Sequence, residues 1–171
     1  LSTLTWKKFL ALPASEYTPN HDSDVPAFMV RTGGTTGISK EVVLTSRGFN
    51  SVAEAMFHTD MSHGWIRQHT NLNLLPPFIA YGIGSGLHHP LSYGITSIIV
   101  LDISPRAVGK LFAKYRPNYV MAGTVQAEQM MRDLQQQKVD MSSLELMSVG
   151  GEAMSKKFEQ EYNAFLKEHN C

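Results

Sequence analysis

The amino-acid sequence predicts an α/β fold, in which a mainly parallel sheet has helices on both faces and follows a β-hairpin with a glycine-rich loop. Two observations support this fold class. Short β-branched runs alternate with segments of helical apolar spacing along residues 46–171. This alternation implies right-handed helical crossovers, which are the connections that parallel strands require. Before them, two extended runs enclose a loop that contains three glycines.

The chain divides into three segments, which we expect to be a lead-in, the hairpin and the alternating α/β layer: 1–25, 26–45 and 46–171. In the lead-in, residues 6–12 favour a short helix, and residues 13–24 are rich in Pro, Asn, Asp and Ser, as loops are. The hairpin strands are Pro26–Arg31 and Glu41–Thr45, because both contain β-branched residues.

Helices and strands then alternate to the end of the chain. Ser46, Thr124 and Ser155 each suit a helix N-cap, and Ser104 followed by Pro105 marks another helix start. The expected strands are 72–75, 96–101, 119–122 and 144–149, and a glycine-rich helix is expected over 82–93. Apolar residues at helical spacing define the inner helix faces: Phe49, Val52, Ala53, Met56 and Phe57; Val108, Leu111, Phe112 and Tyr115; Ala127, Met130, Met131 and Leu134; Phe158, Tyr162, Phe165 and Leu166.

The composition excludes several classes of protein. With 43% hydrophobic and 18% charged residues, the 171-residue chain can bury one core. Fifteen basic and fifteen acidic side chains cancel, which argues against binding of a nucleic-acid backbone. No apolar stretch reaches the roughly 20 residues of a membrane span, and the N-terminus does not resemble a signal peptide. The single cysteine, Cys171, fits a reducing cytoplasm, and the missing initiator methionine suggests an excised piece of a longer protein.

The loop at residues 32–40 has the composition of a polyphosphate site. Its sequence is Thr32-Gly33-Gly34-Thr35-Thr36-Gly37-Ile38-Ser39-Lys40. Glycines allow successive backbone N–H groups to turn inward, the hydroxyls add donors, and Lys40 adds a positive charge. The alternative is a mobile surface loop that only joins two strands. Two other phosphate-binding patterns fail, because a Walker loop has glycine where Ile38 stands, and the dinucleotide fingerprint has glycine where Leu87 stands.

Histidines and serines elsewhere in the chain form no recognisable catalytic or metal pattern. His63, His69, His88 and His89 lack the spacing of a known metal site, so we interpret them as surface or packing residues and predict no metal ligands. No serine lies in a Gly-x-Ser-x-Gly elbow with a suitable acid and histidine.

The run from residue 28 to residue 45 resembles the signature loop of the AMP-forming, adenylate-forming ligases, a family that includes acyl-CoA synthetases, luciferases and peptide-synthetase adenylation domains. The chain departs from this loop at Ser39, where proline is usual, and at Glu41, where glycine is usual. Two later segments also resemble the family. Residues 76–82 resemble its Pro-x-Phe-His-x-x-Gly segment with Ile79 for the histidine, and residues 149–154 resemble its Gly-Gly segment.

The resemblance implies the large N-terminal domain of an acyl-CoA synthetase-like fold, of which residues 1–171 would be a part. It implies ATP as the nucleotide, held by Thr32, Gly33, Gly34, Thr35, Thr36, Gly37, Lys40, Gly151, Glu152 and Ala153, with Lys40 and Thr35 as the catalytic groups. The magnesium-binding glutamate of the family's Tyr-Gly-x-Thr-Glu motif is expected past Cys171. Tyr93-Gly94-Ile95-Thr96-Ser97 only mimics that motif, and we interpret it as a helix-to-strand turn.

The activity that the resemblance implies is an acid–thiol ligase reaction. A carboxylic acid would be activated by ATP to an acyl-adenylate, with release of pyrophosphate, and passed to the thiol of CoA or a carrier protein. These 171 residues alone are expected to be inactive, because the family's remaining motifs are missing from them. The alternative function is a non-catalytic nucleotide-binding or regulatory domain on the same fold.

Overall fold

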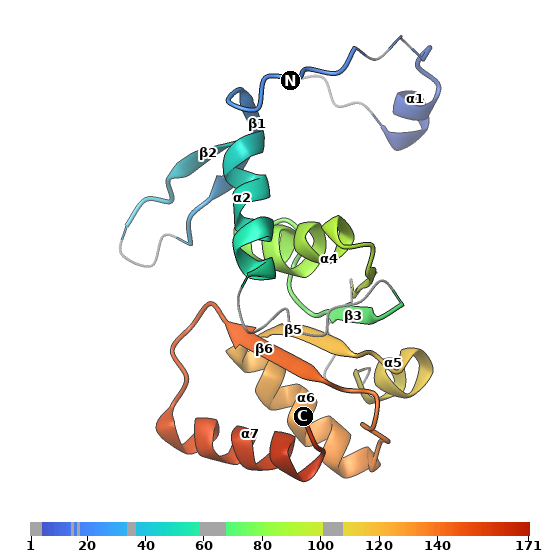
Figure 1. The fold of residues 1–171 in the computed structure, drawn as a ribbon, viewed down its shortest axis with the longest axis vertical. Helices are drawn as coiled ribbons and strands as arrows, with labels where there is room; N and C mark the ends of the chain where they lie inside the picture. Colours follow the sequence, from blue (N-terminus) through green and yellow to red (C-terminus); the bar gives the residue numbers. More distant parts are fainter. Residues whose placement is uncertain (1–4, 15, 17, 34–36, 59–67, 101–107) are drawn as a thin grey trace.

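The computed structural model describes residues 5–14, 16, 18–33, 37–58, 68–100 and 108–171. Figure 1 shows the arrangement, with the lead-in projecting from one end, the hairpin and α2 in the middle, and the sheet with α5, α6 and α7 at the other end. The elements in chain order are α1 (Trp6–Leu10), β1 (Pro26–Arg31), β2 (Glu41–Thr45), α2 (Ser46–Phe57), β3 (Thr70–Asn73), α3 (Ala80–Ile83), the π-helix η2 (Gly84–His88), α4 (His89–Ser92), β4 (Thr96–Ile99), α5 (Val108–Tyr115), β5 (Tyr119–Gly123), α6 (Thr124–Gln137), β6 (Leu146–Gly150) and α7 (Lys156–Glu168). No helix among these residues is long and apolar enough to cross a membrane.

The main sheet has four strands in the order β4-β3-β5-β6, and all three strand pairs are parallel. The crossovers run through α3–η2–α4, then α5, then α6. A separate antiparallel pair, β1 and β2, forms the hairpin in the register Arg31↔Glu41. The predicted fold class is therefore confirmed, and both hairpin strands have the predicted bounds.

The sheet is covered on both faces, as the alternation of β5 shows. Val120 and Ala122 point into the larger core, which also includes buried residues of α5, α6 and α7. Tyr119 and Met121 point into a smaller cluster, against which Tyr81 and residues of α2 and the turn after α4 pack. Because every second residue of a strand faces the same side, helices on both faces bury residues 119–122 of β5.

Aromatic contacts connect the hairpin to the sheet layer. The ring of Phe28 in β1 meets the ring of Phe49 in α2 edge to face at 4.6 Å, and Phe49 stacks on His88 at 4.1 Å. At the other end of α2, Phe57 stacks on Tyr93 at 4.7 Å. The predicted apolar face of α2 is only partly right, since Ala53 is its one buried residue while Val52 and Phe57 are about half exposed.

Two predicted helix caps are wrong by one residue. The hydroxyl of Thr45, not Ser46, accepts a hydrogen bond from the N–H of Gly48 and caps α2. Gly123 is the cap of α6 without a side-chain hydrogen bond, so Thr124 is the first helical residue. The cap of α7 is Ser155, as predicted, and its hydroxyl accepts from the N–H of Phe158. The predicted cap at Ser104 lies outside the described residues.

The strand and helix bounds of the layer shift at several places. The strand predicted at 72–75 is β3, Thr70–Asn73, and the strand predicted at 144–149 is β6, Leu146–Gly150. The helix predicted over 82–93 is not continuous, because η2 interrupts it with a π-helical segment between α3 and α4. The predicted turn at residues 93–97 is confirmed, since Gly94 adopts a φ of 71° between α4 and β4.

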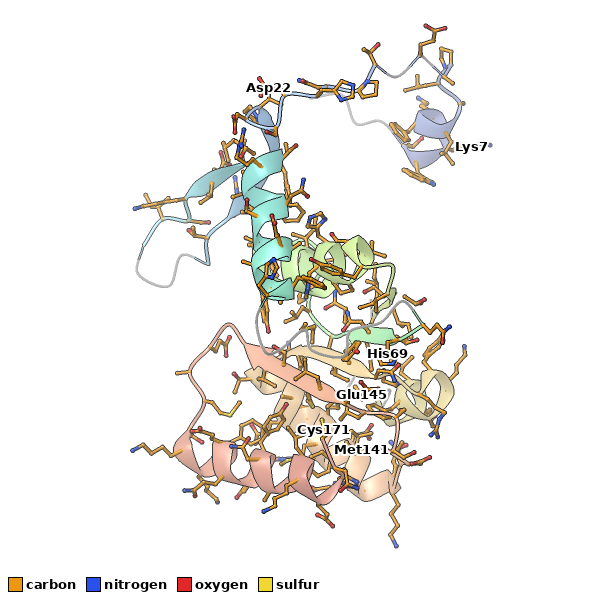
Figure 2. All side chains as sticks on the ribbon, in the orientation of Figure 1. Lys7, Asp22, His69, Met141, Glu145 and Cys171 are labelled. Carbon is orange, nitrogen blue, oxygen red and sulfur yellow. The ribbon has the colours of Figure 1, made fainter. Side chains whose placement is uncertain are left out.

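A polar group joins the amino ends of three strands. Nδ1 of His69, just before β3, shares a hydrogen bond with the hydroxyl of Tyr119 in β5. Nε2 of the same ring lies 3.5 Å from Oε1 of Glu145, just before β6, and Figure 2 shows this pair at the edge of the sheet. The amino ends of the strands lie opposite to their carboxyl ends, where parallel sheets bind their ligands. We therefore interpret this group as structural.

The burial of His89 leads us to predict that the stability of the chain depends on pH. Its side chain is buried, and burial, with a smaller contribution from His88, lowers its pKa to about 4. The unfolded chain, with the ordinary histidine pKa of about 6.5, therefore binds more protons than the folded chain between these values. The contribution of His89 to the free energy of unfolding is therefore greatest above pH ~6.5. It falls by about 2–3 kcal/mol as the pH is lowered to ~4.5.

Urea denaturation at pH 7.5 and 4.5 measures this contribution. The His89→Asn variant, which cannot gain the proton, should lose about 2–3 kcal/mol less than the wild type between the two values. Equal losses in both proteins would show that His89 does not titrate in this way.

Candidate functional site

The described ends of the glycine-rich loop are held together by Thr32 and Lys40. The N–H of Thr32 donates to the carbonyl oxygen of Lys40 at 2.9 Å, and the N–H of Lys40 donates to the hydroxyl oxygen of Thr32 at 2.9 Å. The hydroxyl of Ser39 donates to the carbonyl oxygen of Thr32 at 2.6 Å. Serine thus closes the base of the loop by a hydrogen bond, and its hydroxyl is not free to donate to a ligand. The hydroxyl oxygen of Thr32 accepts from Lys40, and no acceptor among the described residues takes its proton, so this hydroxyl can donate to a ligand.

Of the two cations next to the described ends of the loop, Arg31 is paired with a carboxylate and Lys40 is available to bind an anion. Arg31 forms an ion pair with Glu41, with 2.8 Å between Nη2 and Oε1, so the departure from glycine at residue 41 gives the neighbouring arginine a partner. Lys40 is exposed, and no carboxylate of the described residues pairs with it. Of the predicted site residues, Thr32, Gly33, Gly37 and Lys40 are described and exposed, whereas Gly34, Thr35 and Thr36 lie outside the described residues.

The second part of the predicted site lies where β6 ends. A methyl group built on Gly150 would lie 3.3 Å from the hydroxyl oxygen of Tyr81, and one on Gly151 would lie 3.7 Å from Cδ1 of the same ring. Gly151 has a φ of 92°, in the region that favours glycine. The absence of side chains at Gly150 and Gly151 therefore lets the ring of Tyr81 pack against the backbone of this turn.

Glu152 and Ala153 continue this turn and are both exposed. The carbonyl oxygen of Glu152 accepts a hydrogen bond of 3.4 Å from the hydroxyl of Thr124, at the start of α6. This hydrogen bond connects the segment after β6 to the segment after β5, so the carboxyl ends of these two neighbouring strands are held together. The carboxylate of Glu152 lies outside the core, at the strand's carboxyl end.

A third segment, residues 76–82, follows β3 at the same edge of the sheet. Its Phe78 side chain is 81% exposed, and Ile79, at the place of the family's usual histidine, is 38% exposed. Gly82, in contrast, is buried, and a methyl group built on it would lie 1.9 Å from the carbonyl oxygen of Pro76. The segment therefore folds back on itself so tightly that only glycine fits.

The structure thus brings the ends of β3, β5 and β6 together, as predicted for a parallel sheet. In Figure 1 the hairpin and the carboxyl end of β6 lie on the same side of the view. The histidines His69, His88 and His89 are in ring contacts with neighbouring aromatic side chains, which matches their interpretation as packing residues, while His63 lies outside the described residues.

Sequence patterns did not point to Tyr81 or to the asparagines of β3. Tyr81 touches Gly150, a residue almost 70 positions away, so no local pattern indicates the contact. Asn71 and Asn73 are completely buried on the face of β3 that meets η2. One signal was available, since two asparagines alternate with leucines in a strand that precedes a glycine-rich helix.

A glycine-rich loop between hairpin strands and glycines at the end of a parallel strand agree with the family comparison. The model of the AMP-binding enzyme family matches residues 3–170, so the chain belongs to the AMP-binding enzymes.

Relatives and solved structures of similar fold support the assignment. The chain is 29% identical over 86 residues to the mitochondrial malonate–CoA ligase of Homo sapiens, which is 50% of this chain and 14% of the relative. It is 23% identical over 166 residues to the long-chain-fatty-acid–CoA ligase of Bacillus subtilis (strain 168), which is 94% of this chain and 28% of the relative. The structure of McyG A-PCP complexed with phenylalanyl-adenylate superposes with a TM-score of 0.78 at 20% identity, over 95% of this chain and 26% of the other. The chain therefore spans about a quarter or less of the curated relatives' length.

Proposed function

We propose that the chain is part of the N-terminal domain of an AMP-forming ligase that activates a carboxylic acid with ATP. The acid becomes an acyl-adenylate, pyrophosphate leaves, and the acyl group passes to the thiol of CoA or of a carrier protein. The observation that carries this proposal is the closed base of the loop, where Thr32 and Lys40 hold each other by two hydrogen bonds. It leaves the lysine amine exposed beside the glycine-rich backbone.

In the activation step a carboxylate oxygen attacks the α-phosphorus in line with the leaving pyrophosphate. Negative charge grows on the β- and γ-phosphates as the bond to the α-phosphorus breaks. Lys40 and the hydroxyls of Thr32, Thr35 and Thr36 orient these phosphates and neutralise the charge, while backbone N–H groups of Gly33, Gly34 and Gly37 add donors. Thr35, in the same loop sequence, acts as the second catalytic group.

We assign the adenine to the turn after β6. The bare backbone of Gly151 accepts the flat base, and Glu152 and Ala153 flank it, because all three residues are exposed at a carboxyl edge. Magnesium would accompany the triphosphate. The single cysteine fits a reducing compartment such as the cytoplasm, although the human relative's name places that protein in mitochondria.

Acid-dependent exchange of labelled pyrophosphate into ATP tests the proposal. The ligase that contains this chain should incorporate label only when its carboxylic acid is present, because exchange requires reversible formation of the acyl-adenylate. A screen over short, long and amino acids should give at least one acid with exchange well above background, and the Lys40→Ala variant is the matched negative control. ATP binding without exchange for any acid would instead favour the non-catalytic alternative.

A further inference from the structure

The two asparagines of β3 are the most unusual buried groups of the chain. Asn71 and Asn73 are both 0% exposed, and both point to the carbonyl oxygens of glycines in α3–η2. Nδ2 of Asn71 lies 3.0 Å from the oxygen of Gly86, and Nδ2 of Asn73 lies 3.4 Å from that of Gly82. A buried amide without partners would be costly, so these contacts fix how the helical segment lies on the strand.

Asn73 differs from Asn71 in what its amide holds. The N–H of Leu75 donates to Oδ1 of Asn73 at 3.0 Å, so the side chain turns the backbone directly after β3. Because it also donates to Gly82, the Asn73 side chain is hydrogen-bonded to both ends of the segment over residues 75–82. Asn71 has its second bond to the hydroxyl of Ser97 in β4, away from that segment.

Two glycines leave the space that these hydrogen bonds of Asn73 require. A methyl group on Gly86 would lie 2.4–2.5 Å from the amide atoms of Asn73, so a side chain there would expel the asparagine. A methyl group on Gly82 would collide with the backbone of Pro76. The π-helix begins between these glycines, at Gly84. It contains Gly86, whose carbonyl oxygen accepts from Asn71, whereas Gly82, whose carbonyl oxygen accepts from Asn73, belongs to α3.

Tyr81 lies in this segment of residues 75–82, and its side chain packs against the turn after β6. The ring lies along Gly150 and Gly151, the place to which the proposed function assigns the nucleotide base. We propose that Asn73 is a positioning residue of the nucleotide site: it sets Tyr81 against this turn, so that the ring forms a wall beside the nucleotide base. This inference rests on the proposed function for the identity of the ligand, but the hold of Asn73 on the segment does not.

Hydrogen exchange of the chain tests the hold, with Asn71→Leu as the matched control. Both variants remove a buried amide from the same face of the same strand. In Asn73→Leu the amide of Leu75 loses its acceptor, so it and the amides of residues 79–83 should exchange at least tenfold faster. Asn71→Leu should leave them within about threefold of the wild type. Equal acceleration in the two variants would overturn the inference.

Kinetics of the ligase test the positioning. Asn73→Leu should raise the KM for ATP at least tenfold while the KM for the acid changes less than threefold, and Asn71→Leu should change neither. Should Asn73→Leu fail to fold, Tyr81→Ala removes the wall itself and should give the same split between the two KM values. An unchanged KM for ATP would overturn the positioning role. Absence of acid-dependent exchange in the wild type would instead contradict the proposed function, and hydrogen exchange would still decide the hold.

Discussion

Replacing Lys40 with alanine should weaken ATP binding by roughly ten- to a hundredfold, because a charge-assisted hydrogen bond is worth on the order of 1.5–3 kcal/mol. AMP should lose much less affinity, since it lacks the β- and γ-phosphates that the loop is proposed to hold. Calorimetry of the ligase that contains this chain, with ATP and AMP in parallel, measures the difference.

Arg31→Ala is the matched control for this variant. Arg31 is the cation at the end of the strand that leads into the loop, but its guanidinium is engaged by Glu41. Its removal should change ATP affinity less than threefold. The account of the loop fails if Lys40→Ala leaves ATP affinity intact, or if AMP loses as much affinity as ATP.

Among the glycines that the structure describes, substitution of Gly82 by alanine should cause the largest loss of stability, about 3 kcal/mol. The built methyl group lies 1.9 Å from the oxygen and 2.7 Å from the carbonyl carbon of Pro76. Both are backbone atoms, and the proline ring restricts their movement, so the segment must refold to accept the methyl group. Denaturant unfolding of the chain measures this loss.

Gly48→Ala is the control with the same chemical change. Gly48 lies in the first turn of α2, and its built methyl group meets only the hydroxyl oxygen of Thr45, at 3.4 Å. Alanine is favoured over glycine in helices by up to about 1 kcal/mol, so this variant should be as stable as the wild type or slightly more stable. A similar stability of both variants would mean that the segment after β3 is not as tightly closed as its geometry indicates.

Local sequence patterns predicted the parts of this fold whose causes are local. The hairpin strands have their predicted bounds because β-branched runs and a glycine-rich loop are neighbours in sequence. The inner face of α6 was also right, since Ala127, Met130, Met131 and Leu134 are all buried. The caps of α2 and α6 were missed by one residue, because adjacent residues compete for the cap and backbone geometry decides between them.

The missed features depend on contacts between distant segments. The interruption of the helix by η2 follows from the asparagines of β3 and the glycines above them, a fit that sequence spacing does not encode. Tyr81 was missed for the same reason, since its partner is the turn after β6. The roles of the site's glycines and of Lys40 rest on the composition of the loop and on the family resemblance, and they stay a prediction.

Residue-resolved NMR titration of the labelled chain with ATP and with AMP tests the central claim most directly. The claim is that one chain holds the outer phosphates at the loop and the base at the turn after β6. Amide signals of Gly33, Gly37 and Lys40 should shift with ATP and much less with AMP, while those of Gly151, Glu152 and Ala153 should shift with both nucleotides. Shifts of equal size for both nucleotides at the loop, or none at the turn after β6, would contradict this account.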